Sequence, residues 1–139
     1  MTTAIDQAKE ILTNTVKRFY WINERLKQIA DELKEVQPNK PGAITMSLNG
    51  CGKNCLGCPH IAWLSWHASN SPRLKGKYIA KKITSPLRSA RYQKDGFAQC
   101  NQKVKELISE AIALEKERSS IIKSIDALKT AVKNTEPLV

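Results

Sequence analysis

Two long segments with apolar residues at heptad spacing constrain this chain of 139 residues more than any other feature. In each segment, apolar or small side chains recur at intervals of three and four residues, the spacing with which one face of an α-helix repeats. This periodicity predicts two long helices, each with one buried stripe. The first stripe contains Ile5, Ala8, Leu12, Thr15, Phe19, Ile22, Leu26, Ile29, Leu33 and Val36. The second contains Phe97, Cys100, Val104, Leu107, Ala111, Leu114, Arg118, Ile121, Ile125, Leu128 and Val132.

An antiparallel hairpin is the simplest arrangement of the two predicted helices. The prolines and glycine of residues 37–42 end the first helix, because proline removes a backbone donor and clashes with the preceding turn. With Val36 beside Phe97, the polar stripe residues Thr15 and Arg118 share one layer, which would fix the register. The same heptads would also serve a homodimer. Tyr20 and Trp21 lie off the stripe and mark either a covered side of the hairpin or a surface for a partner.

The segment between the helices has a different periodicity. Residues 44–48 alternate apolar and polar side chains, and residues 60–67 and 77–83 are rich in aromatic and β-branched types, a composition typical of strands. Ser85 and Pro86 predict the start of a short helix that runs to about Lys94. We therefore expect a mainly α (α+β) fold. It has an antiparallel coiled-coil stalk of residues 1–36 and 97–134 and a small inserted metal-binding β-head of residues 37–96.

All of the net charge of +10 lies in residues 37–94. The segments on either side contain equal numbers of basic and acidic residues, whereas this one contains ten basic residues and no Asp or Glu. A concentrated field of one sign attracts polyanions, and nucleic acid is the commonest polyanion in a cytoplasm. A basic surface that serves only solubility would normally have acidic residues interspersed.

Three cysteines lie close together at Cys51, Cys55 and Cys58. No apolar run is long enough to span a membrane and the N-terminus lacks a signal-peptide pattern, so we expect a cytoplasmic protein with reduced thiols. Closely spaced thiolates in a glycine-containing loop are typical ligands of Zn²⁺, which takes four tetrahedral ligands. The fourth ligand is His60, which follows Cys58 by two residues, or alternatively Cys100 near the start of the second helix.

An iron–sulfur cluster is the alternative to zinc. The C-x3-C-x2-C spacing also occurs in radical S-adenosylmethionine enzymes, but those need a large β/α barrel that 139 residues with two heptad helices do not supply. Catalytic zinc is disfavoured too, because residues 37–94 contain no carboxylate to act as a general base. We therefore expect a protein that is not an enzyme and a metal that stabilises the head.

Residues 51–94 resemble a family of small uncharacterised prokaryotic proteins often found on plasmids and mobile elements. The resemblance rests on Cys51-Gly52-Lys53, two further cysteines, His60, the strand Trp63-Leu64-Ser65-Trp66 with its two aromatic residues, and residues 76–81 before a helix. The chain differs in having Ile61 and Ala62 where the family has Gly-Pro, and in a shorter interval between cysteine and histidine. The resemblance implies a Cys/His head followed by an aromatic β-hairpin, and it implies no known function.

We expect the head to bind nucleic acid, DNA rather than RNA, as a regulator or an accessory factor of a mobile element or phage. Cations contact phosphates, and exposed aromatic rings stack on bases. The alternative is an adaptor that docks on a larger nucleic-acid machine such as RNA polymerase. The candidate nucleic-acid-binding residues are Lys53, Arg73, Lys75, Lys77, Tyr78, Lys81, Lys82, Arg88, Arg91, Lys94 and Trp66, whereas we expect Trp63 to belong to the core.

Overall fold

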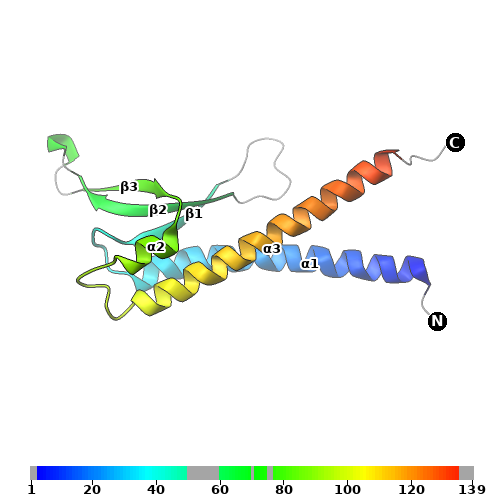
Figure 1. Ribbon diagram of the computed structural model, residues 1–139, viewed down its shortest axis with the longest axis horizontal. Helices are drawn as coiled ribbons and strands as arrows, with labels where there is room; N and C mark the ends of the chain where they lie inside the picture. Colours follow the sequence, from blue (N-terminus) through cyan, green and yellow to red (C-terminus); the bar gives the residue numbers. More distant parts are fainter. Residues whose placement is uncertain (1–2, 50–59, 70, 75–76, 135–139) are drawn as a thin grey trace.

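The computed structural model describes residues 3–49, 60–69, 71–74 and 77–134. They form a mixed α+β fold of two long helices and a three-stranded antiparallel sheet (Figure 1). The elements in chain order are α1 (Ala4–Val36), β1 (Ile44–Asn49), β2 (His60–Ala68), the 3-10 turn η1 (Pro72–Leu74), β3 (Tyr78–Ile83), α2 (Pro86–Arg91) and α3 (Asn101–Asn134). No helix within these ranges is both long and apolar enough to cross a membrane.

Helix α1 has a capping box at its start, and Pro38 is the second residue after its end. The Thr3 hydroxyl accepts a hydrogen bond from the backbone N–H of Asp6 at 3.2 Å, and the Asp6 carboxylate accepts one from the Thr3 backbone N–H at 3.3 Å. These bonds satisfy donors that the first helical turn leaves without partners. After Val36 the backbone of Gln37 is extended, as Pro38 favours. The prediction of a helix that ends at Val36 is confirmed, but the predicted stripe is buried only from Ile22 onward, and Ile5 and Leu12 are exposed.

The predicted strands are also confirmed. The order in the sheet is β1-β2-β3, and Met46 pairs with Trp63, which pairs with Ile83. Side chains alternate between the two faces of a sheet. One face therefore includes the buried Ile44, Met46 and Trp63 and faces the core, and we call the other the outer face.

The core lies where the sheet, α2 and the two long helices meet. Its apolar side chains come from five elements: Ile22, Leu26, Ile29, Ala30 and Leu33 of α1, Val104, Leu107, Ile108, Ala111 and Leu114 of α3, Ile44 and Met46 of β1, Trp63 of β2, and Ala90 of α2. Figure 1 shows α1 and α3 running antiparallel beside this core and diverging toward the N-terminus of α1 and the C-terminal end of α3. Ion pairs cross between the helices from Arg25 to Glu110 and from Arg18 to Glu117.

Three details differ from the sequence-based expectations. Arg118 is buried, but its Nε donates to Asn23 Oδ1 at 2.7 Å instead of sharing a layer with Thr15, whose hydroxyl donates to the carbonyl of Ile11. The acceptor of the Arg118 guanidinium, Asn23, therefore lies nearer to the sheet along α1 than Thr15 does. Helix α2 ends at Arg91, so Lys94 does not continue its basic face. Helix α3 begins at Asn101, after a turn.

Candidate nucleic-acid interface

The cations of the head are exposed wherever the structure describes them. Of the predicted binding residues, Lys53 and Lys75 lie outside the described residues. Arg73 lies in η1, Lys77 directly before β3, and Arg88 and Arg91 on α2. Within the described ranges, no ion pair joins a carboxylate to any of the eight exposed cations of residues 37–94, namely Lys40, Arg73, Lys77, Lys81, Lys82, Arg88, Arg91 and Lys94. Their charge is therefore available to a polyanion.

Strand β3 divides its two adjacent lysines between the faces of the sheet. Lys82 pairs with Leu64 and Lys81 with Ser65, so alternation places Lys82 on the outer face with Tyr78 and Lys81 on the face that carries Ile44. The predicted residues thus do not form one surface. The outer face combines Lys82 with the aromatic residues Tyr78 and Trp66.

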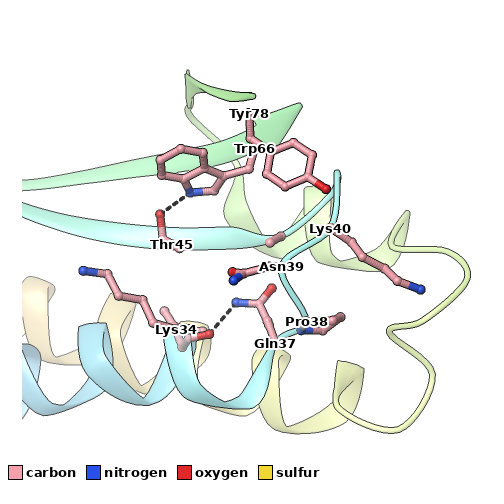
Figure 2. A pocket seen from close by; sticks show the side chains of 10 residues that line it. Lys34, Gln37, Pro38, Asn39, Lys40, Thr45, Trp66 and Tyr78 are labelled. Atoms are coloured by element: carbon pink, nitrogen blue, oxygen red, sulfur yellow. Dashed lines mark hydrogen bonds between the residues drawn. The ribbon is translucent and has the colours of Figure 1, made fainter. Parts of the chain in front are cut away.

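The two tryptophans of β2 have different roles. Trp63 is 7% exposed and belongs to the core, as expected from the sequence. Trp66 is half-buried on the outer face, and its indole N–H donates to the Thr45 hydroxyl at 2.8 Å (Figure 2). This bond satisfies the polar atom of the indole and fixes the ring. The Trp66 ring is therefore a rigid apolar wall on the outer face.

A hollow of about 390 Å³ lies where the end of α1, the loop after it and the outer face of the sheet meet (Figure 2). Tyr78, 45% exposed, lies beside Trp66 at one wall. Lys34 and Lys40 extend to either side. The lining contains two lysines and no carboxylate: Leu33, Lys34, Gln37, Pro38, Asn39, Lys40, Ala43, Thr45, Trp66 and Tyr78.

Gln37 fixes the floor of this hollow. Its side-chain amide donates to the carbonyls of Leu33 at 2.8 Å and Ile44 at 2.6 Å, while its carbonyl oxygen accepts from the Ile44 N–H at 2.9 Å. The Gln93 amide donates to the same oxygen at 2.9 Å, and Asn101 donates to Gln93 at 2.9 Å. This buried network joins the ends of α1, β1, α2 and α3, so the aromatic wall and the helix end keep one relative position.

A second hollow, of about 540 Å³, is a weaker candidate for an anion. Trp63, Lys82, Ile112 and Glu115 contribute to its lining. Burial raises the pKa of Glu115, although the nearby Arg118 opposes this shift. A carboxylate in the lining repels phosphate when it is ionised and is costly to desolvate further. The hollow beside Trp66 and Tyr78 has no such group.

The predicted metal ligands lie mostly outside the described residues. Cys51, Cys55 and Cys58 all fall within residues 50–59. His60 is exposed at the start of β2, and its cross-strand neighbour is Asn49, so the two residues that flank the cysteine segment are adjacent. In the part of the chain that the structure describes, no group of three or more His, Cys, Asp or Glu side chains forms a metal site.

Cys100 lies at the other end of the sheet from His60. Its thiol donates to the Phe97 carbonyl at 3.5 Å, and its side chain packs against the core. Phe97 contacts Gly42, which hydrogen-bonds to Trp66, six residues along β2 from His60. Six residues of strand span about 20 Å. The two alternative fourth ligands, His60 and Cys100, therefore lie too far apart to bind the same metal ion.

Of the ten residues that line the first hollow, sequence reasoning predicted only Trp66 and Tyr78 as site residues and missed the other eight, which include Lys34, Lys40 and Thr45. Lys34 belongs to a helix whose charges sum to zero, and Thr45 is a neutral strand residue, so neither gave a signal. Lys40 was detectable as a member of the segment without acidic residues. Its side chain lies against Gly96, where a Cβ would come within 2.6 Å of Lys40 Nζ, so the missing Cβ leaves room for the lysine.

Comparisons with protein-family models, with curated proteins and with solved structures give no match. The resemblance of residues 51–94 to small plasmid-borne proteins therefore stays a prediction.

Proposed function

We propose that this protein is a non-enzymatic nucleic-acid-binding protein, with DNA as the favoured ligand, and that it acts as a regulator or an accessory factor of a mobile element. One observation carries the proposal: eight exposed cations, which form no ion pairs with described carboxylates, surround a sheet whose outer face carries Trp66 and Tyr78. In this proposal the head of residues 37–96 binds the ligand, and the long helices form a coiled-coil stalk.

The two kinds of side chain would contribute different parts of the binding energy. Lysine and arginine contacts to phosphates release condensed counterions, so affinity falls steeply as salt rises. Stacking on an aromatic ring is worth about 1–3 kcal/mol per base and tolerates any base. Tyr78 is exposed enough to stack, and Lys82 lies four residues further along β3 on the same face. This combination favours sequence-tolerant binding.

The adjacent lysines of β3 provide a matched test. Both Lys81→Glu and Lys82→Glu change the net charge by the same amount, but only Lys82 lies on the outer face. We expect duplex and single-stranded oligonucleotides to bind the wild type with a steep dependence on salt. We expect Lys82→Glu to weaken binding about tenfold or more and Lys81→Glu to weaken it less. Fluorescence anisotropy at several salt concentrations measures both effects.

Two outcomes would contradict this proposal. Absence of binding at about 50 mM salt would exclude nucleic acid as the ligand, because counterion release is strongest there. Equal effects of the two lysine variants would show that only the total charge matters and that the outer face is not the binding surface.

We further propose that Cys51, Cys55, Cys58 and His60 bind one Zn²⁺ that stabilises the head. The support is the ligand spacing in the sequence and the position of His60 beside Asn49. Metal analysis of anaerobically purified protein should find one zinc per chain, and Cys55→Ser should lose it while Cys100→Ser retains it. A brown chromophore with bound iron would establish the iron–sulfur alternative instead.

An adaptor that docks on a nucleic-acid machine is the second candidate. The observation that favours it is an exposed aromatic cluster on α1, where Tyr20 is 66% and Trp21 is 49% exposed and the Arg18 guanidinium lies 4.4 Å from the Trp21 ring centroid. Trp, Tyr and Arg are the residues that most often dominate protein interfaces. Binding of purified RNA polymerase that is lost in Trp21→Ala, without oligonucleotide binding at low salt, would favour this function.

A further inference from the structure

The apolar stripes of α1 and α3 continue beyond the core to the ends where the helices diverge. There the large side chains are exposed instead of buried. Their exposed fractions are 68% for Ile5, 67% for Ile11, 52% for Leu12, 40% for Val16 and 55% for Leu128. Apolar residues gathered at one end of a molecule mark an interaction surface more often than scattered ones do.

Three of these residues, Ile11, Leu12 and Leu128, line a groove of about 550 Å³ between the two helices. Ile11 and Leu12 line it from α1, and Ile121, Ile125 and Leu128 line it from α3. The groove continues the interface that α1 and α3 already form, because the stripes lead from it to buried residues, Ile22 on α1 and Arg118 and Leu114 on α3. The surface therefore extends an existing helix–helix interface into a region where α1 and α3 diverge and no longer cover each other's apolar side chains.

The apolar face at the start of α1 is wider than one neighbouring helix requires. At 100° per residue, the positions from Ile11 through Leu12 to Val16 cover about 140° of the helix circumference. A pair of helices in a coiled coil uses a narrower stripe, whereas a wide stripe is typical of a helix with several neighbours. Helix α3 alone cannot cover this face.

We propose that the groove binds the same groove of a second copy of this chain, so that the four helix ends form an antiparallel four-helix bundle. A second copy offers the same pair of diverging apolar helix ends, and a two-fold axis closes the contact without leaving a further edge. Charge selects the orientation. Each chain has its excess of +10 in residues 37–94 and neutral segments on both sides, so the basic heads repel and lie at opposite ends.

Neighbouring residues of α1 give a matched set of variants for the test. Ile11 and Leu12 line the groove, whereas Thr13 and Asn14 are exposed residues that do not. Sedimentation velocity of the full chain at about 1–100 μM should show a dimer for the wild type and for Thr13→Glu/Asn14→Glu. Ile11→Glu/Leu12→Glu should raise the dimer dissociation constant at least tenfold. Circular dichroism should show unchanged helix content, because both pairs of side chains are exposed in the monomer.

A wild type that stays monomeric at about 100 μM would overturn the proposal, and so would an Ile11→Glu/Leu12→Glu variant that dimerises as well as the control. Small-angle X-ray scattering tests the orientation. The antiparallel bundle predicts a maximum dimension well beyond that of the monomer, with mass concentrated at both ends. A dimer with both heads at one end would contradict the charge argument.

Discussion

At the scale of single residues, Gln37 makes four hydrogen bonds from a buried position. It is 7% exposed and makes hydrogen bonds to Leu33, Ile44 and Gln93 through both atoms of its amide. Each bond satisfies a polar group near the end of an element, and these groups are costly to bury without a partner. One side chain thereby holds the loop between α1 and β1 in place.

We expect Gln37→Ala to lower the free energy of unfolding by about 2–3 kcal/mol, because it leaves buried backbone groups without partners. Gln37→Glu has nearly the same volume but loses both donated bonds, so it should also destabilise the protein. Urea denaturation measures both changes. Gln102→Ala, at an exposed glutamine of α3, is the control and should change stability by less than about 0.5 kcal/mol. If Gln37→Glu left the free energy of unfolding unchanged, the Gln37 side chain would contribute only by filling space.

At the scale of elements, ion pairs couple α1 to α3. Arg25 donates from Nε and Nη2 to both carboxylate oxygens of Glu110, at 2.5 and 2.7 Å, and also contacts Glu32 at 3.4 Å. The hydrogen bonds from Arg25 lower the pKa of Glu110 below its ordinary value, against a smaller opposing effect of burial. The geometry is bidentate and joins the two helices near the buried part of their interface.

This pair predicts how stability depends on pH. A carboxyl group whose pKa is lower in the folded state contributes stability above its unfolded pKa, near 4.3, and the contribution is lost as the pH falls through the folded value. Because Glu110 is 38% exposed, we expect Glu110→Gln to cost about 1 kcal/mol or less at pH 7 and to reduce the stability lost on acidification. Urea denaturation at pH 7 and pH 3 tests this. Glu106→Gln, at an exposed site on the same helix, should retain the acid sensitivity of the wild type.

The periodicity of the sequence predicted the helices and strands because each element repeats its own pattern over several turns or residue pairs. It did not predict contacts that depend on three dimensions. Asn23 lies off the heptad stripe, yet it is the buried partner of Arg118. Heptad spacing also does not reveal where two helices diverge, since Leu12 and Leu26 occupy equivalent positions in the pattern. The cysteine segment stays a prediction because residues 50–59 lie outside the described residues.

At the scale of the whole molecule, burial is concentrated at one end. Leu26 is fully buried in the core that α1, α3, α2 and the sheet form. Leu12 lies two heptads earlier on the same stripe of α1 and is 52% exposed. The same residue type at the same pattern position therefore has two environments. The difference is set by which elements surround it, because the sheet and α2 cover only one end of the helix pair (Figure 1).

This asymmetry makes a direct prediction for one pair of substitutions. Leu26→Ala removes a fully buried side chain and should lower the free energy of unfolding by about 2–5 kcal/mol, whereas Leu12→Ala should cost less than about 0.5 kcal/mol in dilute protein. If a second copy covers the ends of the helices, the cost of Leu12→Ala rises with protein concentration, because dimerisation stabilises only the folded state. Urea denaturation at two protein concentrations separates these contributions. Equal costs for both substitutions in dilute protein would mean that α1 is buried along its whole length within one chain.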